Sequence, residues 1–199
     1  MEKFIKPRLL TPSGQSHKKF WQAVGLCALT AAIFFLPFYL LDGGFFHYAG
    51  DFNSQQISFY RYMNGFVKGA GYPDSAFAGA PRNTFSWATD LGSGVMNAYS
   101  FYLYGSPFFW LSVLLPQSWL PYMMVPLLVL KFGVAGGGAY LYLRRYVKNA
   151  NYAVLGACLY ALSGFAVYNV FFNHFVDVVA LFPYPVSYTH LRAHETAAN

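Results

Sequence analysis

The chain has 199 residues, of which 56% are hydrophobic and only 10% are charged. The charged fraction is less than half of that in an ordinary soluble domain, about a quarter, so the composition excludes a soluble globular protein and indicates a membrane protein. The formal net charge of +6 comes largely from basic clusters beside apolar segments, so we expect no nucleic-acid partner.

Residues 1–19 are basic, and the apolar segment 21–41 that follows has no charged residue. A helix rises about 1.5 Å per residue and the hydrocarbon core of a bilayer is roughly 30 Å thick, so this segment can cross it. The apolar stretch is longer than that of a signal peptide, and no small-residue cleavage site follows Leu41. We interpret the segment as a retained membrane anchor.

Segment 42–119 separates this first span from two further apolar segments, 120–143 and 152–172. Its own apolar run, 108–115, is too short to cross a bilayer. We therefore predict an all-α, polytopic transmembrane protein with about three spans and one long external loop. Loops of this length rarely lack secondary structure, which favours a folded or functional insert.

Residues 54–68 of this loop place apolar side chains at helical spacing, with Asn53 or Ser54 as the N-cap. The pattern predicts an amphipathic helix lying along the membrane surface.

Aromatic residues follow in the second half of the loop, among them Trp87, Tyr102 and Tyr104. Such rings are typical of an interfacial belt. The alternative is a platform on which a sugar ring or a lipid headgroup stacks.

Basic residues precede the first span, and Arg144, Arg145 and Lys148 lie between the second and third. The positive-inside rule then predicts a cytoplasmic N-terminus and an external loop 42–119. Gly133 and Gly137, one helical turn apart in the second span, favour close packing against another helix.

Asp51 lies just beyond the end of the first span, close to the expected membrane surface. A carboxylate there can act as a catalytic base or as a cation ligand for a membrane-bound substrate. The alternative is a turn or a helix cap. Gln55 is a further polar residue of the same stretch.

Lys131 lies about halfway along the second span, where an ammonium costs a few kcal/mol unless it is paired or hydrated. Its partner is expected to be the phosphate of a lipid-linked substrate or a carboxylate, such as Asp177 or one in helices beyond this chain. His174 and Asp177, three residues apart, can share a helix face and bind metal or relay a proton, or can simply be interfacial. Two residues do not make a metal site, so the cofactor stays unknown, with a divalent cation as the candidate.

Residues 186–199 turn polar where a fourth span is expected, and they look like the translation of a sequencing adapter. We predict that they are a non-native tail. Residues 20–185 would then be the N-terminal part of a larger multi-span domain.

Several short motifs, in this order and spacing, resemble the N-terminal part of the bacterial YfhO family. They cover most of residues 20–183 and read Gly50-Asp51-Phe52 with Gln55-Gln56, Phe85-Ser86-Trp87, Leu91-Gly92-Ser93-Gly94, Tyr104-Gly105-Ser106-Pro107-Phe108, Leu130-Lys131 and Tyr160-Ala161-Leu162-Ser163-Gly164-Phe165.

The resemblance implies a multi-pass bacterial cell-membrane protein related to the C-type glycosyltransferases. It implies an inverting transfer of a sugar from a polyprenyl-phosphate donor to an envelope polymer such as lipoteichoic acid, with Asp51 at the position of the acidic residue that serves in catalysis. No Asp-x-Asp pair accompanies Asp51. We expect Lys131, Gln55, Trp87, Tyr102, Tyr104 and His174 to contact substrate. The alternatives are a transporter or flippase of lipid-linked saccharides and a non-catalytic assembly protein.

Overall fold

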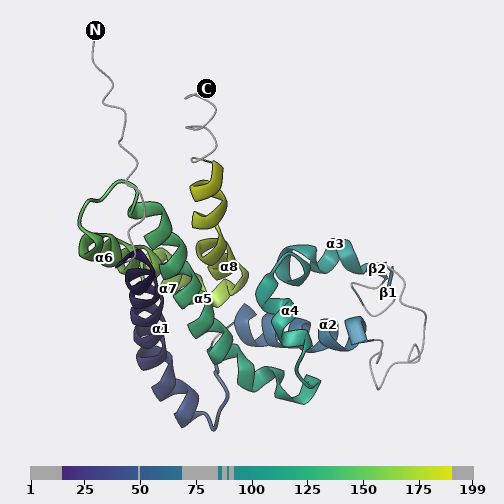
Figure 1. Cartoon of the computed structure of the whole chain (residues 1–199). Coiled ribbons are helices and arrows are strands. Elements are labelled where there is room, and N and C mark those ends of the chain that lie inside the picture. The colour runs from purple at the N-terminus through teal and green to yellow at the C-terminus, as the bar shows by residue number, and fades with distance from the viewer. Residues whose placement is uncertain (1–14, 49, 69–84, 87–88, 90–91, 190–199) are drawn as a thin grey trace. The chain divides into compact units, whose positions relative to one another are not determined.

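The computed structural model of the chain is helical and is shown in Figure 1. It describes residues 15–48, 50–68, 85–86, 89 and 92–189. The contacts divide the chain into two units. The span unit comprises Met1–Phe34, Val129–Tyr168 and Val178–Asn199, and the loop unit comprises Phe35–Leu128 and Asn169–Asp177.

Three segments are long and apolar enough to cross a membrane, His17–Leu41, Gln117–Leu143 and Ala150–Phe172, which confirms the prediction of three spans. Helix α1 (Gln15–Leu41) forms the first and α5 (Leu120–Leu143) the second. Both contain a proline, Pro37 and Pro126, which membrane helices tolerate when other groups satisfy the freed backbone.

The third segment forms a span, as predicted, but its helix is broken after Ala161. Helix α6 (Ala150–Ala161) ends before α7 (Gly164–Tyr168) and the 3-10 turn η4 (Asn169–Phe172). The hydroxyl of Ser163 accepts a hydrogen bond from the backbone N of Ala166 at 3.3 Å, so it acts as a cap at the break. Serine competes in this way with the backbone ladder of a helix.

The glycines of α5 allow the close approach of another helix, as the sequence predicted, and that helix is α1. A Cβ added at Gly133 would lie 3.3 Å from Ala28 Cβ, and one at Gly137 would lie 2.9 Å from Phe20. At Gly136 an added Cβ would overlap the sulfur of Cys27. Small residues lower the distance between helix backbones, which strengthens packing where the hydrophobic effect does not act.

Small and aromatic side chains complete the core of the span unit. Its buried members are Ala23, Ala139, Tyr140, Ala153, Val154 and Ala157. Tyr184 closes another side of α5, since its hydroxyl donates to the carbonyl of Val134 at 2.9 Å. Helical backbone continues over residues 183–189. The non-native character of residues 186–199 stays a prediction.

The loop unit consists of short elements. The π-helical segment η1 (Phe52–Ile57) leads into α2 (Ser58–Lys68). A two-residue antiparallel ladder pairs β1 (Phe85–Ser86) with β2 (Ser93–Gly94). The elements that follow are α3 (Val95–Tyr99), the π-helical η2 (Ser100–Tyr104), α4 (Pro107–Val113), the 3-10 turn η3 (Gln117–Trp119), and, beyond α5, η4 and the start of α8 (His174–Leu181).

Helix α2 is amphipathic, as predicted, but its buried face packs on α4 (Figure 1). The rings of Tyr60 and Phe109 meet edge to face at 5.7 Å, and Asn64 Nδ2 donates to the carbonyl of Ser112 at 2.9 Å. The face that we predicted to lie on the membrane is therefore covered by protein.

The predicted N-cap of this helix is also wrong, because helical backbone already begins at residue 51. The side chain of Asn53 accepts from Tyr48, and Ser54 Oγ donates to the carbonyl of Gly50. Both side chains bond the preceding loop instead of capping the helix.

Candidate functional site

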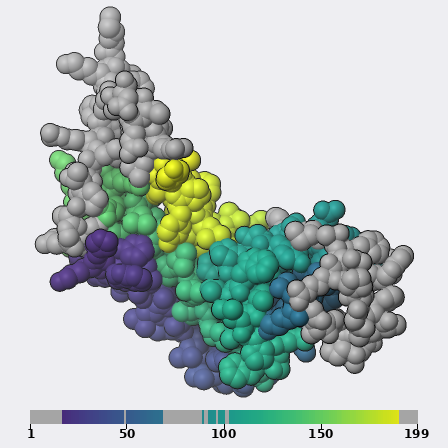
Figure 2. Space-filling view, turned by 45° about the vertical axis from the view of Figure 1, so that its right-hand side comes forward, coloured from purple at the N-terminus to yellow at the C-terminus, as the bar shows by residue number. Residues whose placement is uncertain are grey.

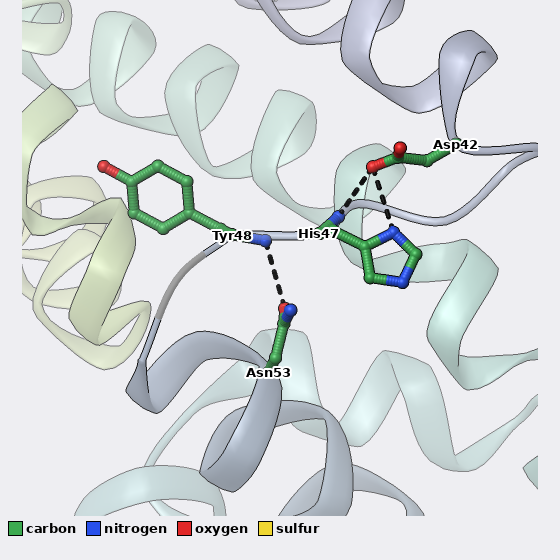
Figure 3. A network of polar contacts seen from close by, with 4 residues as sticks. All are labelled: Asp42, His47, Tyr48 and Asn53. Carbon is green, nitrogen blue, oxygen red and sulfur yellow. Dashed lines mark hydrogen bonds and ion pairs between the residues drawn. The ribbon is translucent and has the colours of Figure 1, made fainter.

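The loop from α1 to η1 is held by side chains that bond its own backbone (Figure 3). Asp42 Oδ2 accepts from the backbone N of His47 at 3.1 Å and lies 3.0 Å from His47 Nδ1. Tyr48 N donates to Asn53 Oδ1 at 3.1 Å. The backbone and side-chain hydrogen bonds of His47 lower the pKa of the Asp42 carboxyl. Together these bonds set the path by which the chain enters the helix at Asp51.

Gly50 makes the turn that immediately precedes Asp51. Its φ is +70°, a conformation that residues with a Cβ rarely adopt, and an added Cβ would overlap the ring of Phe171 in η4. Glycine is therefore needed at this position for two reasons. The turn that carries Asp51 rests directly on η4, a segment more than a hundred residues later in the sequence.

Asp51 is half-buried and adopts helical backbone angles, φ −64° and ψ −23°, at the start of η1. Its side chain caps no backbone N–H. One carboxylate oxygen accepts a hydrogen bond from Gln55 Nε2 at 3.0 Å, and the other accepts none from the described residues. The interpretation of Asp51 as a helix cap is thus wrong. Gln55 lies beside the carboxylate, and its contact with substrate stays a prediction.

A cluster of buried polar side chains lies on the other side of the same helical segment. Gln56 Nε2 lies 3.3 Å from His174 Nδ1 and forms a hydrogen bond that links η1 to the start of α8. Tyr60, one turn later, bonds Ser106 and Asn173 and lies near the carboxylate of Asp177. All six side chains are at most 7% exposed. The motifs that the sequence placed far apart therefore meet within the loop unit.

The electrostatics of this polar cluster are clearest at Tyr60. Burial and the nearby carboxylate of Asp177 raise its pKa well above the ordinary value, while hydrogen bonds with Ser106 and Asn173 act in the opposite direction. The phenol therefore stays protonated at any physiological pH. A neutral hydroxyl and an amide can both donate and accept hydrogen bonds without adding net charge.

Three of the other predicted substrate contacts lie elsewhere or outside the described part. Tyr104 is half-buried among Phe109 and Trp110, and burial raises its pKa. Trp87 lies outside the described residues, and for Tyr102 only the backbone, within η2, is described. None of these is brought to Asp51 by a described contact.

Lys131 is fully buried in the α5 helix and belongs to the span unit. Asp177 and His174 belong to the loop unit. The pairing of Lys131 with Asp177 or with a phosphate stays a prediction.

Tyr60 and Ser106 are members of the cluster that the sequence analysis missed. A usable signal was present, because Gln56, Tyr60 and Asn64 follow at intervals of four residues and so share one helix face. All three are buried. Among the described residues, no three His, Cys, Asp or Glu side chains come together as a metal site.

The family model of bacterial membrane protein YfhO matches residues 24–185, which include every described residue of this site. No curated protein and no solved structure matches the chain. The chain belongs to the YfhO family of bacterial membrane proteins.

Proposed function

We propose that this YfhO family protein is a membrane glycosyltransferase, with Asp51 as its catalytic base. The donor would be a sugar on polyprenyl phosphate, and the acceptor a hydroxyl of an envelope polymer such as lipoteichoic acid. The observation that carries the proposal is the state of Asp51. Its carboxylate caps no helix, is oriented by Gln55 and keeps one oxygen without a hydrogen bond from the described residues.

The proposed reaction follows from a base at this place. Asp51 removes the proton of the acceptor hydroxyl while the acceptor oxygen forms a bond to the anomeric carbon of the sugar. The bond from that carbon to the phosphate oxygen breaks, and the electron pair leaves with polyprenyl phosphate. Attack opposite to the leaving group inverts the configuration. Lys131 is proposed to stabilise the phosphate that leaves.

The neighbouring polar side chains support this assignment by their chemistry. Gln55 accounts for the orientation of the carboxylate, and the bond from Gln56 to His174 holds the next residue of the same helix in place. Two π-helical segments, η1 and η2, lie in this unit. Such segments occur frequently at functional sites.

The variant Asp51→Asn tests the proposal in the full-length protein. Asparagine can still accept the hydrogen bond from Gln55, so folding should be retained while the base is lost. We expect sugar transfer to fall on the order of a hundredfold or more, the usual size of an acid-base effect. The matched control is Asp74→Asn, which removes the same charge from the same long loop and should retain most transfer. Normal transfer by purified Asp51→Asn protein would refute the assignment.

A flippase of lipid-linked saccharides is the second candidate, and the burial of Lys131 within a membrane span favours it. The glycines of α5 do not, because α1 and Tyr184 occupy the space beside them. If the protein is a flippase, Asp51→Asn should change the rate of lipid translocation in proteoliposomes. In the proposed enzyme, Asp51→Asn should lower sugar transfer on the order of a hundredfold or more and leave lipid translocation unchanged.

The site must also face the outside if it acts on an envelope polymer, and the basic residues of the N-terminus support this orientation. Cysteines replacing Ser16 and Ala78 should differ in labelling by an impermeant reagent in intact cells, with only the second modified. Labelling of the first alone would reverse the orientation.

A further inference from the structure

Helix α4 has a buried face and an exposed face, and both carry large apolar side chains. Phe108, Phe109 and Ser112 are buried against the rest of the loop unit. Trp110 and Leu111 are each 46% exposed, and Leu114, the C-cap, is 81% exposed. Figure 2 shows this part of the chain, in teal, at the surface. Contiguous exposed apolar side chains mark a surface that another phase or molecule covers.

The chain runs directly from this helix into a membrane span. Only the residues from Leu115 to Trp119 separate α4 and its cap from α5, and the connection is folded into two turns. Leu115 N donates to the carbonyl of Ser112, and Trp119 N donates to that of Pro116, each at 3.0 Å. Trp119 is 58% exposed. Tryptophan is enriched at membrane interfaces, so its position at the start of a span is the basis for assigning the end of α4 to interfacial depth.

Two basic side chains of α2 border this connection. Arg61 and Lys68 are both exposed, and a spacing of seven residues puts them on one side of a helix, about 10 Å apart along its axis. Gln117 Nε2 donates to the backbone carbonyl of Arg61 at 2.7 Å, and Lys68 Nζ donates to the carbonyl of Leu115. Cations beside an apolar face are the arrangement that binds helices to anionic bilayers.

The indole of Trp110 can enter the lipid below the headgroups. Its Nε1 donates to the backbone carbonyl of Tyr104 at 3.0 Å, so the ring's polar group is already satisfied by the protein. An indole without that bond would have to keep its N–H at the wet interface.

We propose that α4 and η3 form a membrane-inserted hairpin in the leaflet where α5 begins. Trp110, Leu111, Leu114 and Trp119 lie in lipid, and Arg61 and Lys68 contact the phosphates of anionic phospholipids. The buried face of the hairpin holds Tyr60 through Phe109. Insertion therefore anchors α2 to the bilayer surface, and with it η1 and the preceding Asp51. The inference does not depend on the glycosyltransferase assignment.

Depth-dependent fluorescence quenching tests the insertion. In the full-length protein in nanodiscs, replacing Trp21, Trp87, Trp119 and any further tryptophan by phenylalanine leaves Trp110 as the reporter. Phosphatidylcholine brominated on its acyl chains should remove at least about half of the emission. Aqueous iodide should quench it several-fold less than it quenches tryptophan amide in buffer. Free access by iodide would overturn the proposal, and so would insensitivity to both quenchers, which would indicate that a protein partner covers the face.

A second comparison tests the phosphate contacts. At low salt, brominated phosphatidylglycerol should quench Trp110 about twofold more than brominated phosphatidylcholine at equal mole fraction, because each cation attracts anionic lipid. The double variant Arg61→Gln/Lys68→Gln should abolish this difference. Arg144→Gln/Lys148→Gln, with the same charge loss between α5 and α6, should retain it. Equal quenching by the two lipids in the unsubstituted reporter protein, or equal loss in both double variants, would overturn the role of Arg61 and Lys68.

Discussion

The close contact of α5 with α1 can be tested by adding one methyl group. Gly136→Ala places a Cβ that overlaps Cys27 Sγ and lies 3.0 Å from Cys27 Cβ and 3.1 Å from the carbonyl oxygen of Ala23. The last two atoms belong to the backbone or are fixed to it, so a side-chain rotation cannot relieve the overlap fully. The helices must move apart.

The matched control is Gly25→Ala in α1, where an added Cβ meets nothing within 4 Å. Both substitutions replace glycine by alanine inside an apolar helix, so the change in helix propensity largely cancels between them. The difference then isolates the overlap, which costs about 1–3 kcal/mol when a methyl is forced into a packed interior.

Thermal unfolding of the purified chain in a mild detergent, followed by circular dichroism, measures this difference. For a chain of this size, 1 kcal/mol corresponds to roughly 2–4 °C, so Gly136→Ala should melt about 2–12 °C below Gly25→Ala. Adding Cys27→Ala removes the sulfur and should restore part of the loss. Equal melting temperatures of the two alanine variants, or no relief by Cys27→Ala, would refute the close contact.

Three further predictions concern other parts of the molecule. The sulfurs of Cys27 and Cys158 lie 3.7 Å apart, so oxidation by copper phenanthroline should join them in a disulfide. A chain then cleaved at a protease site inserted in residues 69–84 should separate into two fragments only after reduction, and separation without reductant would contradict the contact. Because the folded-state pKa of Tyr60 is raised, its contribution to stability is complete below about pH 10, the pKa of an unfolded tyrosine, and is lost as the pH rises toward the folded pKa. The unfolding midpoint should therefore differ less between pH 8 and pH 11 in Tyr60→Phe than in the unsubstituted protein, and an equal difference in the two proteins would disprove the shift. Lys131→Met should raise the donor concentration needed for half-maximal transfer while Lys131→Arg retains some donor use, and unchanged donor dependence in a folded Met variant would assign Lys131 a structural role.

The sequence by itself determined the features that depend on local pattern. Apolar runs of sufficient length predicted three membrane spans, because the hydrogen bonds of a helix close within four residues and the bilayer demands a fixed length. Small residues one turn apart predicted close packing of α5, although not that α1 would be the partner. The placing of Gln55 four residues after Asp51 was enough to bring their side chains together.

The tertiary structure alone decided which distant residues meet. The bond from Gln56 to His174 joins residues 118 positions apart, and no periodicity connects η1 with α8. The tertiary structure also covered the apolar face of α2 with α4 and left the outer face of α4 exposed. An amphipathic pattern specifies that a face needs an apolar partner, but lipid and protein satisfy that need equally well. The choice between them follows from the packing of the whole unit, which is why a membrane-surface helix was expected at α2 while the exposed apolar face was found on α4.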